Sequence, residues 1–394
     1  MLSLPTELWL LIGAYLSESD LRDAIQVNHT FHSLLTPLLY RTFFICGAQG
    51  GPARPPRRRN MTSSKPRVPT PYVGRASATM ERLKMIQSSS MRMGAIKSCT
   101  LCHFGNQTLQ NEETTPDALK QVLQESVAFI SMLPDCRDIV IESVHISNRQ
   151  LKQLISPHLR PVNLSARSLT ILDGDSTHTS GSQPQCPLKN LTICGLKGSE
   201  QSVREFAEWS MSGDLQSFSV RSVTEHYLSF FHIRFFHIQL LQRSFPNLRR
   251  LELVRDITSA RVLECLPMLE ELSLPFTSPP LMLTPTILPR LRTFQGSGGQ
   301  ARSITPGRPI RVLHVLVDFK GLLPSSAGDE APNFGSTTSI LELSVKVGTL
   351  AEVIWITHLC PSLQVFCLSS TLPNKIDAVS VNGTICEKAN SQRR

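Results

Sequence analysis

A short apolar motif, L-x-x-L-x-L, recurs along most of this chain and limits its fold more than any other feature. Three copies are clear, each shortly after a proline, and they begin at Leu248, Leu269 and Leu363. Fainter copies begin at Ile96, Cys136, Ala166, Leu188, Leu215, Leu291, Ile310 and Thr338. A motif that returns at a nearly constant interval predicts a stack of similar units rather than one compact core.

The interval between copies indicates which kind of stack to expect. From Cys136 onward, successive starts are separated by 30, 22, 27, 33, 21, 22, 19, 28 and 25 residues. Most of these values fall in the range of leucine-rich repeats, about 20–29 residues, in which the L-x-L piece is a strand with buried leucines. We therefore predict the α/β class, with an irregular leucine-rich-repeat solenoid over residues 95–372 that has parallel strands on its concave side and helices outside. It is expected to be irregular because the Asn that commonly follows the strand is largely absent.

Two sets of residues follow from this arrangement. The segments with the composition of outer helices are 117–132, 202–211, 225–241, 259–266 and 350–358. The non-leucine strand positions face the concave surface, and they are Arg250, Glu252, Glu271, Ser273, Thr293, Gln295, Val312, His314, Ile340, Glu342, Val365 and Cys367. Mixed polar and apolar residues there suit binding of a protein segment. The candidate substrate-binding residues are Arg250, Glu252, Glu271, Ser273, Thr293, His314 and Glu342, and the alternative is an ordinary solvated sheet face.

The first forty residues have helical rather than repeat character. Leu8, Ile12 and Leu16 recur at every fourth position, after Pro5 and Glu7, which suit a first helical turn. Ser17 and Ser19 are candidate caps for a second helix carrying Leu21 and Ile25. Asn28 is a candidate cap for a third helix, which carries Phe31, Leu34, Leu35, Leu38 and Leu39. Three short helices are too small to be stable alone, so they should dock on the rest of the chain or on a partner.

These residues carry a resemblance to a known family. Residues 3–44 resemble the F-box in order and spacing through Leu4, Pro5, Glu7, Leu8, Ile12, Leu16, Asp20, Leu21, Val27, Asn28, Phe31, Leu35, Leu38, Leu39, Tyr40 and Phe43. The combination is similar to F-box proteins of mushroom-forming fungi. The resemblance implies that the motif binds a Skp-type adaptor, which connects it to the cullin and RING subunits of an SCF-type ubiquitin ligase. The rest of the chain would then select a protein substrate.

The resemblance also assigns residues to the adaptor surface. By their places in the motif, Leu4, Pro5, Leu8, Ile12, Leu16 and Leu21 are expected at or just under that surface. The alternative for each of them is that it only packs the three helices together. Pro5 is the strongest interface candidate.

The positive charge of the chain is concentrated in one segment. The formal net charge is +9, and residues 47–80 supply +7 of it, with six prolines and a single aromatic residue. Residues 46–94 are therefore expected to be a disordered basic linker, either simply solvated or containing a nuclear localisation patch at Arg57–Arg59 with Lys65 and Arg67. Because the remainder is close to neutral, the charge predicts no nucleic-acid partner.

Cysteines and sequons point to different compartments. Ten cysteines, several within apolar segments, indicate a reducing compartment, cytoplasmic or nuclear. Six Asn-X-Ser/Thr sequons, at Asn28, Asn60, Asn106, Asn163, Asn190 and Asn382, keep open a secreted or surface glycoprotein. The apolar run from Leu8 to Leu16 lacks the basic flank of a secretory signal and is too short to cross a membrane.

No pattern in the sequence predicts catalysis, a metal or a cofactor. Cys99-Thr-Leu-Cys102-His103 fits a haem-attachment motif, but it lies on a predicted strand. His226, His232 and His237 are spaced by six and five residues, unlike ligands that share one helix face. Asp173-Gly-Asp-Ser176-Thr-His178 is expected to be a surface loop rather than a catalytic triad.

Four regions result from these expectations: residues 1–45 as the F-box, 46–94 as the linker, 95–372 as the solenoid and 373–394 as a C-terminal tail. The leading hypothesis is a non-enzymatic substrate receptor of a ubiquitin ligase, with no membrane partner. The alternatives are a secreted or surface repeat glycoprotein and an F-box scaffold that acts outside ubiquitination.

Overall fold

The structure is a computed structural model that divides into two compact units, one made of Met1–Ser212 with Val223–His232 and the other of Gly213–Ser222 with Ile233–Arg394. It describes residues 5–47, 76–104, 116–155, 163–173, 188–221, 230–253, 260–275, 281, 283–284, 286–315, 340–347, 360 and 362–370. The predicted helix at 350–358 and the tail at 373–394 lie outside these residues. In the described part, no helix is both long and apolar enough to span a bilayer.

The first unit begins with the three predicted helices, α1 (Thr6–Tyr15), α2 (Glu18–Val27) and α3 (His29–Leu39). Ser17 caps α2 in a capping box with Asp20, and the Asn28 side chain accepts a hydrogen bond of 2.8 Å from the Phe31 N–H at the start of α3. Both caps are at predicted positions, because short polar side chains can replace the hydrogen-bond partners that a helix N-terminus lacks. The prediction of three short helices is confirmed.

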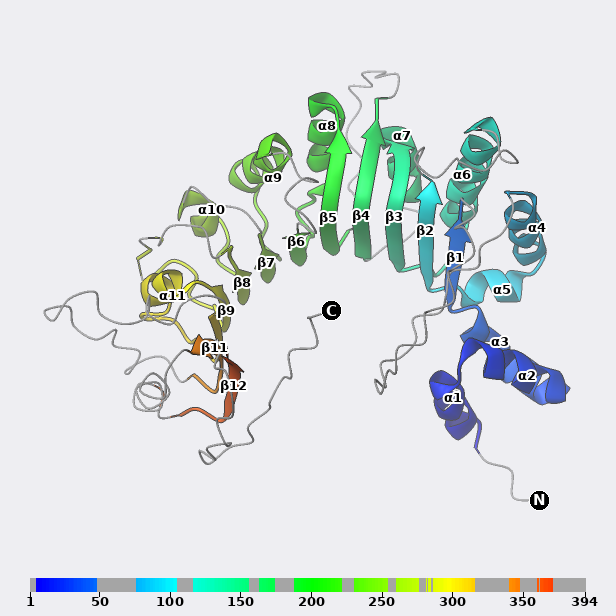
Figure 1. The fold of residues 1–394 in the computed structure, drawn as a ribbon, viewed down its shortest axis with the longest axis horizontal. Helices are drawn as coiled ribbons and strands as arrows, with labels where there is room; N and C mark the ends of the chain where they lie inside the picture. The colour runs from blue at the N-terminus through cyan, green and yellow to red at the C-terminus, as the bar shows by residue number, and fades with distance from the viewer. Residues whose placement is uncertain are drawn as a thin grey trace, which may run out of the picture. The chain divides into compact units, whose positions relative to one another are not determined.

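A parallel sheet follows, in which each strand pairs with the next one along the chain. Its strands are β1 (Thr42–Cys46), β2 (Ser98–Phe104), β3 (Asp138–Ser147), β4 (Asn163–Leu172) and β5 (Asn190–Gly198). The other helices of this unit are α4 (Ala76–Gln87), α5 (Ser90–Ala95), α6 (Pro116–Ser131), α7 (Asn148–Leu154) and α8 (Glu200–Ser210). Figure 1 shows α6, α7 and α8 on one side of strands β2 to β5, which leaves a helix-free face on the other side.

The apolar motif positions of these strands form the core. Ile139 and Ile141 of β3 are essentially unexposed, while the alternating residues Asp138, Val140 and Glu142 face the other way and are partly exposed. Neighbouring strands are in register, so the same alternation continues across the sheet. This is the parallel arrangement with helices that the α/β prediction requires, and the α/β class is confirmed.

A row of left-handed backbone positions crosses strands β2 to β5. His103, Ser143 and Ser168 have φ of 59°, 54° and 51°, and Gly195 has φ of 90°. Each follows directly after a residue of one register row, since Cys102 pairs with Glu142, Glu142 with Arg167 and Arg167 with Cys194. At each of these positions the left-handed residue puts a kink in the strand. After the kink the side chains that point to the core are one residue out of step with those before it, so Val144 and Leu169 are buried at the position where regular leucine-rich repeats carry Asn.

The second unit continues the same pairing rule with shorter strands. They are β6 (Ser217–Arg221), β7 (Arg250–Glu252), β8 (Glu271–Ser273), β9 (Thr293–Gly296), β10 (Val312–Val315), β11 (Glu342–Val347) and β12 (Val365–Ser370), all parallel and paired in chain order. Its helices are α9 (Phe230–Gln242), α10 (Ala260–Glu264) and α11 (Gly298–Ile304). Leu251, Leu272 and Leu313 occupy one register row and are at most 1% exposed.

Two of the predicted motif copies start at the wrong residue. Register pairs Ile141 with Ala166 and Leu313 with Leu343, so Ala166 ends its copy rather than beginning it, and the copy placed at Thr338 begins at Ile340. In β4 the kink creates a second apolar pair, Leu169 and Ile171, which imitates the motif. Ile340, predicted on the concave surface, is instead buried in the core at 2% exposure.

The helices beyond the motif were partly predictable. α6, α8, α9 and α10 fall within or close to the predicted segments; the described part of α9 begins at Phe230, and residues 225–229 of its predicted segment lie outside the described residues. α4 and α5 lie inside the range 46–94 that was expected to be a disordered linker, and β1 includes residue 46. Leu83 and Ile86 of α4 are buried, and this apolar contact explains why the chain is ordered there despite its basic composition. The most basic part, residues 48–75, lies outside the described residues.

Candidate functional site

The apolar surface of α1 is the first candidate. Its exposed apolar side chains, with their exposed fractions, are Leu8 (43%), Leu10 (38%), Leu11 (55%), Ile12 (41%) and Tyr15 (85%). Val27, at the end of α2, is 67% exposed. Single exposed apolar residues are ordinary on protein surfaces, but Leu8, Leu11, Ile12 and Tyr15 are spaced as i, i+3, i+4 and i+7, so they share one face of α1, as in a binding surface.

The attachment of α1 to α3 explains why this patch is left uncovered. Gly13 is buried, and a Cβ atom there would lie 2.7 Å from Leu38 Cδ1 and 2.8 Å from Leu35 Cδ2, so α1 approaches α3 closely at this point. Trp9 packs edge-on against Phe31, with ring centroids 4.6 Å apart. Gly13 and Trp9 make the close contacts with α3, while Leu8, Leu11, Ile12 and Tyr15 stay at least 41% exposed.

The predicted adaptor-binding residues differ in how exposed they are. Pro5, Leu8 and Ile12 are exposed, Leu16 is half-buried, and Leu21 is in the core at 7% exposure. Leu4 lies outside the described residues. Sequence reasoning missed Leu11 and Tyr15, although the nearly unbroken apolar run of α1 was a usable signal, because a helix with one buried side cannot hide apolar residues all round.

The second candidate is in the second unit, where Figure 1 shows α9, α10 and α11 on one side of the strands and no described helix on the other, which is the helix-free face of this unit. The predicted substrate-binding residues lie in two rows across neighbouring strands. Arg250, Glu271, Thr293 and Glu342 belong to the row that begins the strands, and Glu252, Ser273 and His314 belong to the row two residues further on. Register therefore brings all seven onto one face of the sheet, as expected for alternate strand positions.

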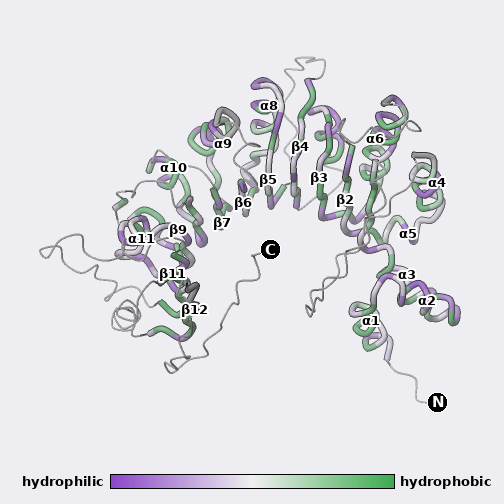
Figure 2. Tube along the Cα trace, in the orientation of Figure 1, coloured by the Kyte–Doolittle hydropathy of each residue, from purple (hydrophilic) through white to green (hydrophobic). Residues whose placement is uncertain are grey.

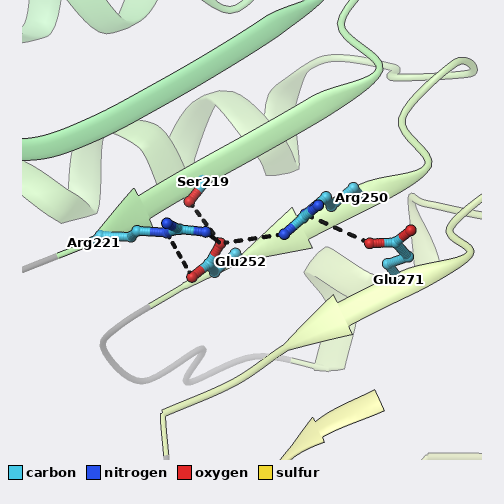
Figure 3. Close-up of polar contacts among 5 residues, drawn as sticks. All are labelled: Ser219, Arg221, Arg250, Glu252 and Glu271. Atoms are coloured by element: carbon cyan, nitrogen blue, oxygen red, sulfur yellow. Dashed lines mark hydrogen bonds and ion pairs between the residues drawn. The ribbon is translucent and has the colours of Figure 1, made fainter. Parts of the chain in front are cut away.

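A chain of charged contacts crosses this face at β6, β7 and β8 (Figure 3). Glu252 accepts hydrogen bonds from Arg221 at 2.7 and 2.8 Å and from the Ser219 hydroxyl at 2.9 Å. Arg250 lies between two carboxylates, 3.9 Å from Glu252 and 3.5 Å from Glu271. Basic and acidic side chains therefore alternate across this face. The side chains of Arg221, Arg250 and Glu271 are about half exposed, so each could form an ion pair with a charged group of a bound protein.

The helix-free face of the first unit carries an amide ladder instead. Asn163 donates to the Asp138 carboxylate, and Asn190 donates to the Asn163 side-chain oxygen. These two asparagines belong to sequons, and Asn28 of a third sequon caps α3. A glycan on Asn163 or Asn190 would remove a donor of the ladder and insert a bulky group between neighbouring strands.

The structure also places the residues of the apparent chemical motifs. Cys99 points to the core of β2, while Cys102 pairs with Cys46 of β1, their Sγ atoms 2.7 Å apart, so the two cysteines of the Cys-x-x-Cys-His stretch serve opposite faces. Asp173 accepts hydrogen bonds from Ser199 and Ser202 at the start of α8, which lower the pKa of its carboxyl. Burial lowers the pKa of His237 on α9. His226 lies outside the described residues, and so do residues 174–178 of the Asp173–His178 stretch.

Comparison with known proteins identifies one region. Residues 1–46 match the F-box-like domain family, which covers α1, α2, α3 and β1. A search of curated proteins finds no match to the chain. The N-terminal segment is thus an F-box-like domain, and it is followed by a parallel sheet with helices.

Proposed function

We propose that this chain is the substrate-recognition subunit of an SCF-type cullin-RING ubiquitin ligase. Its F-box-like domain binds a Skp-type adaptor, and through it the cullin and RING subunits. The observation that carries the proposal is the uncovered apolar surface of α1, with Leu8, Leu11, Ile12 and Tyr15 exposed, within the segment that matches this domain. F-box domains generally bind such adaptors, and clustered exposed apolar residues on one helix face often mark a protein–protein contact.

The strands after this domain are proposed to form an irregular leucine-rich-repeat solenoid that holds a protein target on its helix-free face. In-register parallel strands with buried L-x-L positions support this, because each repeat then buries its apolar side against the next. The rows containing Arg250, Glu252 and Glu271 are proposed to contact the target. The combination of domains is proposed to be of fungal type, on the N-terminal resemblance alone.

The contribution to ubiquitination in this proposal is proximity. A target lysine held near a charged conjugating enzyme reacts at a high effective concentration, so the receptor needs no catalytic group of its own. In the described residues, the His, Cys, Asp and Glu side chains form no group of three that could hold a metal ion. The chain is proposed to be non-enzymatic and to act in the cytoplasm, the nucleus or both.

Of the two alternatives, the secreted glycoprotein is the less compatible with the side-chain contacts. Asn163 and Asn190 are held in the amide ladder, and the eight described cysteines are free thiols. A scaffold that binds the adaptor outside ubiquitination uses the same α1 surface. Affinity purification from cells with and without proteasome inhibition separates these roles, since targets of a ligase accumulate on the chain when degradation is blocked.

The adaptor contact is tested by titrating purified Skp-type adaptor into the chain in a calorimeter. Leu8→Asp and Leu11→Asp should each weaken binding by at least about 2 kcal/mol, roughly 30-fold, because each places a charge in a desolvated contact. Met132→Asp is the matched control, since Met132 is an apolar residue on the surface of the same unit, 52% exposed. Point substitutions are preferable to removing residues 1–45, which would also remove most of β1 from the sheet. Full affinity in both α1 variants would exclude α1 as the adaptor surface.

A further inference from the structure

A row of basic side chains lies where the strands of the first unit begin. The position just before each strand is Arg41 for β1, Lys97 for β2, Arg137 for β3 and Lys189 for β5. Backbone hydrogen bonds show that these are equivalent positions, since Lys97 N–H donates to Arg41 O at 3.0 Å and Arg137 N–H to Lys97 O at 2.8 Å. Figure 2 shows hydrophilic colour at the starts of β2 to β5. We call Arg41, Lys97, Arg137 and Lys189 the basic row.

The same repeat position carries three further basic residues in the second unit, Arg249 before β7, Arg292 before β9 and Arg311 before β10. Glu270 before β8 is acidic, and the residues before β6, β11 and β12 are uncharged, namely Gln216, Leu341 and Gln364. An exposed sheet edge in a chain with 40 basic and 31 acidic residues should carry both signs about equally. Among the charged residues at this repeat position in the described part of the chain, seven are basic and one is acidic, and this imbalance indicates a common cause.

The cations of the basic row are largely available to a ligand. Arg41, Arg137 and Lys189 are exposed and form no ion pair with any residue that the structure describes. Lys97 is the exception, because its ammonium lies 2.7 Å from the Asp135 carboxylate. The Lys97 ammonium, and to a smaller extent Arg137, lower the pKa of Asp135, in keeping with a positive potential at this edge. Like charges at successive strands repel one another, and a bound anion removes that repulsion.

We propose that the basic row binds an acidic, extended segment of a protein target. The row spans four strand spacings of about 4.8 Å, roughly 19 Å, which is the length of about six extended residues at ~3.3 Å each. A segment with Asp or Glu at alternate positions would then turn about three carboxylates toward the row. This inference rests on the proposed function in one respect only, which is that the bound protein is a target for ubiquitination.

The surroundings favour a polypeptide over a nucleic acid. Proteins that bind single strands combine basic grooves with aromatic side chains on which bases stack. Among the described residues, the one aromatic side chain in the set of large exposed hydrophobics is Tyr15, on α1. At the strand starts beside the row, the Ser98 hydroxyl can hydrogen-bond to the backbone of an extended segment. Asn163 and Asn190 each keep one further amide hydrogen for this, because the Asp138 carboxylate of the same register row already accepts from Asn163, and the Asn163 side-chain oxygen accepts from Asn190.

The proposal is tested by fluorescence anisotropy at low salt with a labelled peptide of alternating Glu and Ser, about a dozen residues long. The test variant combines Arg41→Ser, Arg137→Ser and Lys189→Ser. The control variant combines Lys120→Ser, Arg149→Ser and Lys152→Ser, which lie exposed on α6 and α7 of the same unit and change the net charge equally. The basic segment 47–80 is unchanged in both proteins, so its own attraction for the peptide cancels.

The test variant should bind the peptide about tenfold more weakly, as expected from three exposed ion pairs of up to ~1 kcal/mol each, and the control should change by less than about twofold. Equal weakening in both variants would overturn the proposal, and so would tighter binding of a single-stranded RNA that is lost with the same three residues. Adaptor affinity is measured in parallel and should stay unchanged, which separates failure here from failure of the proposed function.

A photoreactive version of the peptide, added to the unsubstituted full chain, gives a second measurement that does not depend on the variants. Cross-links mapped by mass spectrometry should gather at the starts of β1 to β5. Cross-links confined to residues 48–75 would contradict the proposal.

Discussion

The apolar residues of α1 and those of the strands behave in opposite ways. In the strands of the second unit, Leu251, Leu272 and Phe294 are at most 1% exposed and lie in register with one another. In α1, Leu8 and Leu11 are 43% and 55% exposed, although they belong to an equally apolar sequence. The difference shows that the strands complete their own core by stacking, while α1 keeps an apolar surface that its own unit leaves uncovered. In the proposed function, stability and adaptor binding therefore depend on separate sets of leucines.

The strongest test of this difference is to shorten one of the leucines that are buried between the strands. Leu272→Ala should lower the free energy of unfolding by about 2–5 kcal/mol, because it removes buried methyl groups and leaves a cavity between strands. Leu8→Ala, with the same change of side chain, should alter it by less than about 1 kcal/mol. Urea unfolding followed by circular dichroism measures both. Similar losses for the two variants would contradict the division into separate sets.

Tyr15 tests the other side of the comparison. It is 85% exposed, so Tyr15→Ala should leave the urea midpoint unchanged and weaken adaptor binding by about 2 kcal/mol. Val27→Ala, on α2, is the companion variant and reports whether the contact extends beyond α1. Unchanged adaptor affinity in Tyr15→Ala would restrict the surface to the leucines of α1.

Arg308 shows that the stacked region also depends on one buried cation. It is 1% exposed, and its guanidinium donates to the carbonyls of Thr284, Ile287, Ile304 and Pro306. Arg308→Met keeps the length of the side chain but leaves these carbonyls without their donor, which should lower the free energy of unfolding by about 2 kcal/mol. Arg290→Met, at an exposed position nearby in the sequence, should have little effect in the same urea experiment. A loss in both variants alike would show that the guanidinium contacts are not what matters.

The smallest expected effect is a pH dependence at His237. Burial lowers the pKa of its imidazole below the ordinary 6.5, and its Nε2 is buried without a hydrogen-bond partner among the described residues. Below pH 6.5 the unfolded chain takes up a proton that the folded chain does not, so the contribution of this group to stability is complete above pH 6.5 and falls as the pH drops. In His237→Leu, the loss of stability between neutral pH and pH 5 should be smaller, as read from urea midpoints along a pH series. An unchanged slope would assign the acid sensitivity to other groups.

The sequence predicted those parts of the fold in which a local pattern is compatible with a single local structure. Ser17 and Asn28 cap helices where expected, and the motif copies at Leu248 and Leu269 lie in strands with their leucines buried. The motif copy in β4 was predicted to begin at the wrong residue, because the kink at Ser168 leaves one buried apolar pair before it and another after it. Only the pairing of β4 with β3 shows which pair belongs to the motif. Helical character over residues 80–87 can be predicted from the sequence, whereas the burial of Leu83 and Ile86, which orders α4, cannot be read from local composition.

The candidate surfaces were predictable to different degrees. The strand positions of Arg250, Glu252 and Glu271 follow from the alternation of side chains once the motif is recognised. The apolar run of α1 indicates that some of its apolar residues must be exposed, but which ones depends on Gly13 making the close contact with α3, so Leu11 and Tyr15 were missed. The basic row was missed because counting charge by segment conceals residues that lie far apart in sequence and occupy the same repeat position.

Hydrogen–deuterium exchange of the full chain, alone and with a Skp-type adaptor, tests the central claim most directly. If the uncovered surface of α1 is the adaptor site, the amides of residues 6–15 should gain protection on binding, while those of β7 to β10 keep the exchange they already have. Protection of the strands with no change in α1, or binding that protects neither region, would contradict the assignment.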